Sequence, residues 1–143
     1  MIANRTIVIT GASSGIGKSI LEMLAAKENH NRIIAASRSI QKLTGFDENV
    51  TLFPCDLSTR EGVDALFEKA AEQFEKIDVL ICNAGAPYYE RYDYEDWDRI
   101  EKIFSLNTFS CMYSYSYHSR RLNGGRCRDS DAAGGGELWP INV

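Results

Sequence analysis

Three glycines near the start of the chain lie in the segment Thr10-Gly11-Ala12-Ser13-Ser14-Gly15-Ile16-Gly17. An apolar run precedes this segment and helical spacing follows it, so backbone N–H groups and the positive end of a helix could meet a pyrophosphate there. In that role Gly11 permits a tight turn, Gly15 a close approach of phosphate, and Gly17 close packing of the helix on the strand. The two serines can donate hydroxyl hydrogen bonds to phosphate oxygens. The segment predicts a dinucleotide-binding turn, and a purely structural strand–helix turn is the alternative.

The residues about twenty positions further on bear on the choice of dinucleotide, because a carboxylate there takes the ribose 2′-hydroxyl of NAD in many such folds. Ser37, Arg38 and Ser39 occupy this place, and no Asp or Glu occurs from residue 32 to residue 41. Arg38 can stack on adenine and pair with a 2′-phosphate, which a carboxylate would repel. These residues favour NADP(H) over NAD(H), and the alternative is an arginine that is merely solvated after a strand.

Strand-like and helix-like patterns alternate along the chain and must position these residues. Apolar runs predict strands at 6–9, 32–37, 51–53 and 78–82, and helical spacing predicts helices over 15–29, 58–74 and 96–113. Ser58 and Glu61 have the form of a capping box at the start of the second helix. Alternating strands and helices imply parallel pairing through right-handed crossovers. We therefore expect an α/β fold, a Rossmann-type doubly wound parallel sheet that is incomplete, with about four strands and flanking helices.

Two of the predicted helices carry an apolar stripe that would face the sheet. The stripe of the second helix consists of Val63, Leu66, Phe67, Ala70, Ala71 and Phe74. The stripe of the third consists of Trp97, Ile100, Ile103, Phe104 and Cys111.

Residues 114–143 differ in composition from the rest of the chain. They contain five of the eleven glycines, including Gly134-Gly135-Gly136, and no apolar run of strand length. We expect two parts: an NAD(P)-binding Rossmann core over 1–113, and a low-complexity tail over 114–143 that is disordered or irregular. The break in pattern fits a frame error or a truncated gene product, and a natural flexible tail is the alternative.

The Gly-x-x-x-Gly-x-Gly spacing of the first motif resembles the short-chain dehydrogenase/reductase family, in its compact form. Three further motifs occur in the family's order. Asp56-Leu57 is similar to the family's adenine contact, Asn83-Ala84-Gly85 to the motif that supports the sheet beside the cofactor, and Asn107 to the first member of the catalytic Asn-Ser-Tyr-Lys set. The resemblance covers about residues 3–113. It implies an NADP(H)-dependent oxidoreductase that transfers hydride between nicotinamide and a small carbonyl or alcohol substrate.

Each of these further motifs also has a simpler interpretation. Asp56 could open the turn before the second helix, residues 83–85 could form only a turn, and Asn107 could be a hydrogen-bonded core residue on the apolar side of its helix. Taken together, the motifs imply one set of site residues, with Asn107 as the catalytic residue and no metal. The cofactor-binding members are Gly11, Ser13, Ser14, Gly15, Ile16, Gly17, Ser37, Arg38, Asp56, Leu57, Asn83, Ala84 and Gly85.

The rest of the family's catalytic set has no match in the chain. In the family a Tyr acts as general acid, a Lys four residues later lowers its pKa, and a Ser orients the carbonyl. The last lysine is Lys102, and none of the tyrosines at 113, 115 and 117 has a lysine at that spacing. We therefore expect the 143-residue chain to bind cofactor weakly and to be inactive. A non-catalytic dinucleotide-binding fragment or interaction module is the alternative, and the glycine spacing disfavours a sugar-nucleotide epimerase of the extended type.

Composition and charge exclude several other classes. A net charge of −4 argues against a nucleic-acid partner, and no apolar run is long enough to cross a membrane. The N-terminus lacks a secretory pattern and the four cysteines lack paired spacing, so we expect a cytoplasmic protein with reduced thiols. The family resemblance implies a homo-oligomer. Without a further strand beside it, the run at 78–82 would be an exposed apolar edge, and we expect low stability.

Overall fold

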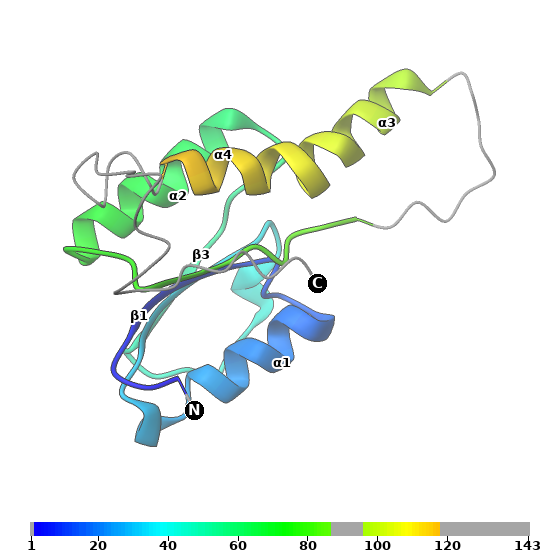
Figure 1. Cartoon of the computed structure of the whole chain (residues 1–143). Helices are drawn as coiled ribbons and strands as arrows, with labels where there is room; N and C mark the ends of the chain where they lie inside the picture. The colour runs from blue at the N-terminus through cyan, green and yellow to red at the C-terminus, as the bar shows by residue number, and fades with distance from the viewer. Residues whose placement is uncertain (1, 87–95, 118–143) are drawn as a thin grey trace.

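A parallel sheet lies at the centre of the molecule (Figure 1). Its four strands have the order β3-β2-β1-β4. The computed structural model describes residues 2–86 and 96–117. Its strands are β1 (Thr6–Thr10), β2 (Arg32–Ala36), β3 (Val50–Phe53) and β4 (Val79–Ile81). In the register of the sheet, Ile34 and Leu80 flank Val8 on its two sides. The predicted α/β fold with a parallel, Rossmann-type sheet is confirmed, and each strand lies close to its expected position.

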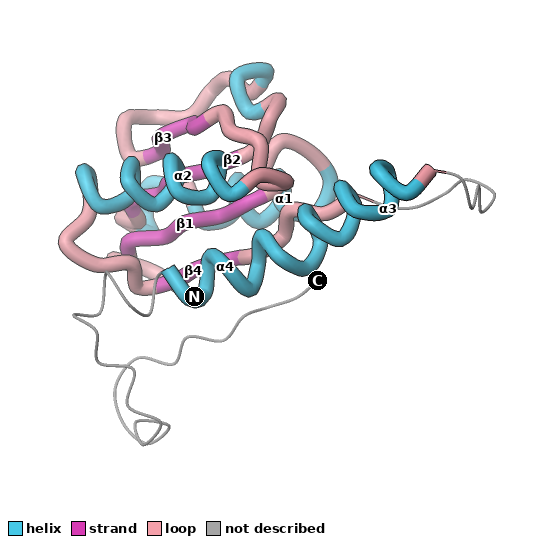
Figure 2. Tube along the Cα trace, turned by 90° about the horizontal axis from the view of Figure 1, so that it is seen from above, coloured by secondary structure: helices cyan, strands magenta, loops and turns pink. Residues whose placement is uncertain are grey.

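Helices cover both faces of this sheet (Figures 1 and 2). Helix α1 (Gly15–Leu24) lies on one face, and α2 (Arg60–Gln73) lies on the other. Beside α2 runs a continuous helix made of α3 (Trp97–Phe104), a π-helical stretch (Ser105–Phe109) and α4 (Ser110–Tyr117). In the two described parts of the chain, no helix is long and apolar enough to span a bilayer.

Alternate residues of the strands supply two cores, because successive side chains of a strand point to opposite faces of the sheet. The core on the α1 side is formed by Ile7, Ile9, Ala12, Leu21, Leu24, Ile33, Ala35, Ile40, Val50 and Ile81. The core on the α2 side is formed by Val8, Ile34, Ala36, Leu57, Val63, Leu66, Phe67, Ala70, Phe74, Ile77, Leu80 and Cys82. Strands that are apolar on both faces are what a sheet covered on both sides requires.

Helix α4 is held against α2 by aromatic and polar contacts. The rings of Tyr117 and Phe67 stack with centroids 5.1 Å apart. The Tyr113 hydroxyl donates to Asp64 Oδ1 at 2.9 Å and accepts from Arg60 Nε at 3.2 Å. The helix therefore continues to Tyr117, past the end expected at residue 113, because its last turn packs on α2. Residues 118–143, where most of the predicted tail lies, are outside the described residues.

Two other predicted helix boundaries were wrong. Helix α1 ends at Leu24, and the expected remainder contains a separate 3₁₀ turn at Lys27–Asn29. Helix α2 is capped by Thr59, whose Oγ1 accepts from the Gly62 N–H at 3.1 Å, and not by Ser58. Ser58 lies in the turn before the helix, where its N–H and hydroxyl both donate to Asp56 Oδ1, at 3.0 and 2.7 Å.

The predicted apolar stripe of the third helix divides between two faces. Cys111 and Leu106 pack against the core on the α2 side. Trp97 and Phe104 point away from it and are 72% and 57% exposed. The prediction assumed α-helical spacing through residues 105–109 and so placed the residues before and after them on the same face. The π-helical stretch takes more residues per turn, so the two sets face different directions. Ala71 of the second stripe is also exposed.

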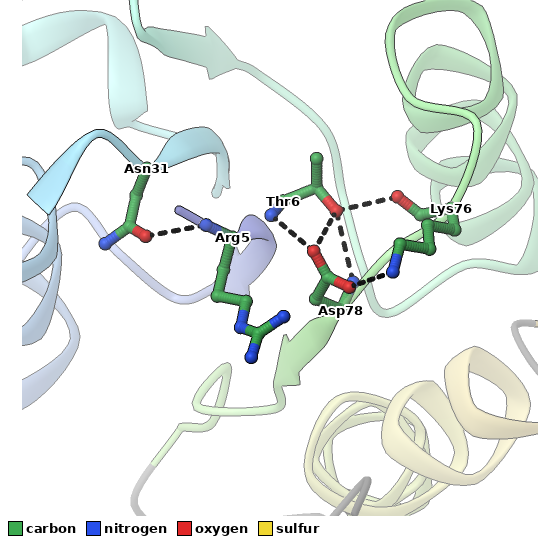
Figure 3. Close-up of polar contacts among 5 residues, drawn as sticks. All are labelled: Arg5, Thr6, Asn31, Lys76 and Asp78. Atoms are coloured by element: carbon green, nitrogen blue, oxygen red, sulfur yellow. Dashed lines mark hydrogen bonds and ion pairs between the residues drawn. The ribbon is translucent and has the colours of Figure 1, made fainter. Parts of the chain in front are cut away.

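Polar contacts fix the amino ends of β1 and β4 (Figure 3). The Thr6 N–H donates to Asp78 Oδ2 at 3.0 Å, and the Asp78 N–H donates to Thr6 Oγ1 at 3.2 Å. Lys76 Nζ lies 2.8 Å from Asp78 Oδ1. Burial raises the pKa of the Asp78 carboxyl, but the Lys76 ammonium and the Thr6 hydrogen bonds outweigh burial and leave this pKa below its usual value.

We predict that Asp78→Asn lowers the free energy of unfolding near neutral pH by about 1–2 kcal/mol, because hydrogen bonds to a charged group are lost. A depressed folded-state pKa stabilises the protein above the unfolded pKa of about 3.9, and this stabilisation is lost as pH falls through the folded pKa. The difference between variant and wild type should therefore shrink in acid. Urea unfolding at several pH values measures it.

The matched control is Asp47→Asn, because the Asp47–Lys27 ion pair is solvent-exposed, with side chains 55% and 83% accessible. Its unfolding free energy should stay close to that of the wild type. Equal losses of unfolding free energy in both variants, or a loss in Asp78→Asn that does not depend on pH, would contradict a stabilising role of the Asp78 carboxylate.

Candidate functional site

The carboxyl ends of the strands meet at one edge of the sheet, and a cleft of about 310 Å³ lies there. Ten of the predicted site residues line it: Gly11, Ser13, Ser14, Ser37, Arg38, Asp56, Leu57, Asn83, Ala84 and Gly85. Ser39, from the segment 37–39 that the sequence singled out, also lines the cleft. Cys55 and Leu106 complete the lining and were not predicted. Gly15, Ile16, Gly17 and Asn107 are absent from the lining.

The turn between β1 and α1 forms one wall of the cleft. Gly11 has φ +66°, and a Cβ there would lie 2.7 Å from the Ala84 Cα, so both its conformation and its surroundings require glycine. Gly15, with φ +54°, begins α1 and also adopts the left-handed region. The Ser14 side chain makes no capping hydrogen bond, so it leaves the N–H groups of the first turn for an acceptor in the cleft.

Gly17 contributes to the site through packing. It is buried, and a Cβ there would collide with Asn83 Nδ2 and the Gly11 carbonyl oxygen. Asn83 Nδ2 donates to the Gly11 carbonyl at 3.1 Å, which joins the end of β4 to the glycine turn. Close helix–strand packing is the role that the sequence predicted for Gly17. Ile16 is 59% exposed and does not face the cleft.

The Thr10 hydroxyl is a structural centre of the site that sequence reasoning missed. It donates to the Ile81 carbonyl at 3.3 Å and accepts from the N–H groups of Asn83 and Ala84 at 3.0 and 3.1 Å. Thr10 is 4% exposed, and these bonds tie the ends of β1 and β4 together. A threonine that ends a buried strand directly before a glycine turn was the available signal.

The opposite wall carries the residues expected near an adenosine. Ser39 Oγ and Ser13 Oγ are hydrogen-bonded at 3.2 Å, which joins this wall to the glycine turn. The Ser37 Oγ is buried and has no hydrogen-bond partner among the described residues. A buried hydroxyl without a partner is costly, and Ser37 is one of the residues that line the cleft. Arg38 is exposed at the rim and brings the positive charge of this wall.

Two further groups set the charge of the cleft. Hydrogen bonds from the Ser58 hydroxyl and N–H hold the pKa of Asp56 below its usual value, with smaller contributions from the charges of Arg38 and Lys102. Asp56 is therefore a carboxylate near neutral pH. Burial, together with the Asp56 charge, raises the pKa of Cys55 to about 11, so this thiol is neutral and unreactive.

Asn107 lies in the π-helical stretch above the same edge. Its Oδ1 accepts from the Ala86 N–H at 2.8 Å, and its Nδ2 donates to the Ala86 carbonyl at 3.0 Å. The simpler interpretation of Asn107 as a core residue was wrong, because the residue is exposed. Its side chain holds the segment after β4 against the helix, and its neighbour Leu106 reaches the cleft.

Comparison with known proteins now decides the family. The family model for short chain dehydrogenases matches residues 5–126 of this chain. The chain belongs to the short-chain dehydrogenase family. The family resemblance inferred from the glycine spacing and the three later motifs is confirmed.

Individual relatives of this short-chain dehydrogenase agree with the assignment. A 3β-hydroxysteroid dehydrogenase 2 of Eggerthella lenta is 31% identical, with 87% of this chain and 52% of the relative covered. The L-sorbose reductase of Gluconobacter frateurii, solved with NADPH and L-sorbose, is 28% identical with a TM-score of 0.73 over 86% of this chain and 49% of that one.

A 3-ketoacyl-(acyl-carrier-protein) reductase of Brucella melitensis, solved with NADH, has a TM-score of 0.73 at 21% identity over 89% of this chain and 56% of that one, and shows the shared fold. Family members use NAD(H) or NADP(H), and these two structures hold one of each. The chain spans about half the length of the relatives it matches.

We predict that Gly17→Ala lowers the free energy of unfolding by about 1–3 kcal/mol, because the added methyl group displaces Asn83 from the glycine turn. Gly85→Ala is the matched control, since a Cβ there meets only Asn107 Oδ1 and Cγ at ordinary contact distances of 3.4 and 3.8 Å. Urea unfolding of both variants should show a loss in the first and almost none in the second. The reverse order would rule out the packing role of Gly17.

Proposed function

We propose that the cleft binds NADP(H) in preference to NAD(H), and that the described residues are the cofactor-binding part of an NADP(H)-dependent oxidoreductase of carbonyls and alcohols. The observation that carries the proposal is the wall formed by Ser37, Arg38 and Ser39. It offers a cation and an unsatisfied buried hydroxyl close to the glycine turn. Both groups suit a phosphate on the adenosine ribose.

The other lining residues fit the remaining parts of a dinucleotide. The free N–H groups of the first turn of α1 and the hydroxyls of Ser13 and Ser14 suit the pyrophosphate. Asp56 and Leu57 stand where the adenine would lie, at the carboxyl end of β3. Residues 83–85 form the floor under the nicotinamide half, held by the Thr10 hydroxyl. The role of each residue toward the cofactor is a prediction from the sequence that this geometry supports.

The bound dinucleotide would supply or accept hydride, and the residues of this chain bind and position it. Asn107 fixes the helix over the cleft through its two bonds with Ala86 and is a positioning residue in this proposal. The sequence offers no Tyr-x-x-x-Lys pair to move the proton. We infer that these 143 residues bind cofactor weakly without turnover.

A non-catalytic dinucleotide-binding or interaction module is the second candidate, and the missing Tyr-x-x-x-Lys pair favours it. The two functions differ in whether the chain turns over a carbonyl substrate. NADPH consumption by the purified chain with a panel of ketones and aldehydes would support the oxidoreductase and refute the inactivity. The cytoplasmic location stays a prediction from the sequence.

We predict that Arg38→Ala weakens NADPH binding about tenfold or more and leaves NADH binding nearly unchanged, because only NADPH carries the 2′-phosphate. Fluorescence titration of the purified chain with each reduced cofactor measures both constants. Arg5→Ala is the matched control, since Arg5 precedes β1 at the opposite edge of the sheet (Figure 3). Equal affinities for NADH and NADPH in the wild type, or an equal loss of both in Arg38→Ala, would refute the preference.

We also propose that the chain self-associates through the outer face of α3 and α4, as the family resemblance implies. Exposed apolar side chains gather on this helix: Trp97, Phe104, Phe109, Met112 and Tyr115. Exposed apolar faces of this kind mark interaction sites. We predict an oligomer for the wild type in analytical ultracentrifugation, and a monomer for the double variant Phe104→Glu, Met112→Glu.

Met23→Glu is the control for this prediction, because Met23 is 64% exposed on α1, across the sheet from the proposed interface. It should sediment like the wild type. A monomeric wild type at micromolar concentration, or dissociation caused equally by Met23→Glu, would refute the interface.

A further inference from the structure

A second cavity, of about 250 Å³, lies where the start of α2 meets the π-helical stretch and α4. Figure 2 shows α4 running beside α2. Leu57 lines both this cavity and the cleft, so the two are neighbours. No residue of the glycine turn, of the segment 37–39 or of the segment 83–85 lines the second cavity. The proposed dinucleotide site therefore leaves this cavity without a role.

The body of the second cavity is apolar and partly aromatic. Leu57 and Val63, which are 4% and 1% exposed, line it from the core on the α2 side. Phe109 and Tyr113 line it from the neighbouring helix. A cavity of about 150 Å³ with an apolar lining can bind benzene, so 250 Å³ has room for one or two fused aromatic rings. Aromatic side chains in the wall favour an aromatic occupant.

The hydroxyl groups of three serine and threonine residues around this apolar body already have partners. Ser58 Oγ donates to Asp56 Oδ1 at 2.7 Å, and Thr59 Oγ1 donates to the Asp56 carbonyl at 2.9 Å. Ser110 Oγ donates to the carbonyl of Leu106, one helical turn earlier. Because these groups are satisfied within the protein, they do not require hydrogen bonds from a ligand.

Arg60 differs from these residues, because its guanidinium keeps unused donors at the rim of the cavity. Its Nε donates to the Tyr113 hydroxyl at 3.2 Å and lies 3.5 Å from Asp64 Oδ2. Its Nη groups make no hydrogen bond to any residue that the structure describes, and the side chain is 74% exposed. Its Cζ lies 5.6 Å from the centroid of the Tyr113 ring, which holds the guanidinium beside the aromatic wall. Asp64 balances part of the charge but leaves the Nη donors to a carboxylate, which fits their planar fork.

We propose that the second cavity is a binding site for a small aromatic monocarboxylate. Its rings would pack against Phe109 and Tyr113, and its carboxylate would accept hydrogen bonds from the Arg60 Nη groups. A groove that a second copy of the chain covers is the simpler interpretation, because Phe109 is 58% exposed and belongs to the proposed interface. Two observations favour the small molecule. The cavity reaches buried core side chains, and the guanidinium at its rim complements a negative charge.

Isothermal titration calorimetry of the full chain with 2-naphthoate tests this proposal, and 2-naphthamide is the matched neutral probe of the same shape. We expect one naphthoate site with a dissociation constant of about 0.1 mM. Naphthamide should bind about tenfold more weakly, because its hydrogen bonds with Arg60 lack charge assistance. Both probes are compared on the wild-type chain, so this arm stays decisive if a variant misfolds. The absence of saturable binding up to about 5 mM naphthoate, or equal affinities for the two probes, would overturn the proposal.

Arginine variants locate the carboxylate. Arg60→Gln should weaken naphthoate binding about tenfold and leave naphthamide binding nearly unchanged, because only the charged probe loses its partner. Arg38→Gln is the matched control, since Arg38 is also exposed but lines the cleft and not the second cavity. It should bind naphthoate like the wild type. A loss of naphthoate affinity in Arg38→Gln alone would place the probe in the cleft and overturn the proposal.

Phenylalanine variants locate the rings. Phe109→Ala should weaken both probes about tenfold, because an aromatic wall of the cavity is removed. Phe104→Ala is the matched control: Phe104 and Phe109 are 57% and 58% exposed on the same face, but only Phe109 lines the cavity. Phe104→Ala should leave both affinities unchanged. Equal losses in the two variants would assign the binding to the interface between copies of the chain and refute the cavity. None of these readouts depends on whether the cleft binds a dinucleotide.

Discussion

The Thr10 hydroxyl closes the carboxyl edge of the sheet, and the rest of the site depends on that closure. It bonds to the carbonyl of Ile81, the last residue of β4, and to the N–H groups of Asn83 and Ala84 directly after it, and Asn83 bonds back to Gly11. Each of these groups is buried or partly buried, where an unpaired polar atom is costly. The glycine turn, the floor of the cleft and the start of α1 thus hold one another in position. Gly11 and Gly15 adopt the left-handed region without strain, so these hydrogen bonds are what fix the position of the turn.

Much of this architecture could be predicted from local sequence. Apolar runs located β1 to β4, since a strand covered on both faces leaves a continuous signal. The glycine spacing located the turn, and ten residues predicted for the site line the cleft. The predictions that failed concern features for which neighbouring side chains compete, such as the cap of a helix. Thr59 caps α2 while the Ser58 hydroxyl bonds to Asp56, and the residue types alone do not show which of the two hydroxyls forms the cap.

The helix that contains Asn107 was harder to predict for a different reason. Its apolar residues occupy two faces, one against the sheet and one toward solvent, so a single stripe could not be read from the sequence. The contact of Asn107 with Ala86 joins residues 21 positions apart through backbone groups, which carry no residue-type signal. The same holds for Cys55, which reaches the cleft because it follows β3.

The π-helical stretch of residues 105–109 has a consequence for everything beyond it. An α-helix advances by about 100° per residue, so one residue more or less in a helix rotates all later side chains by that angle. Here the additional residue sets the rotational phase at which Cys111 and Tyr113 face the sheet and α2, while Met112 faces out. The stretch thus sets which side chains of α4 face inward, and an insertion or deletion of one residue within it would turn a different set of side chains toward α2 without changing any residue type.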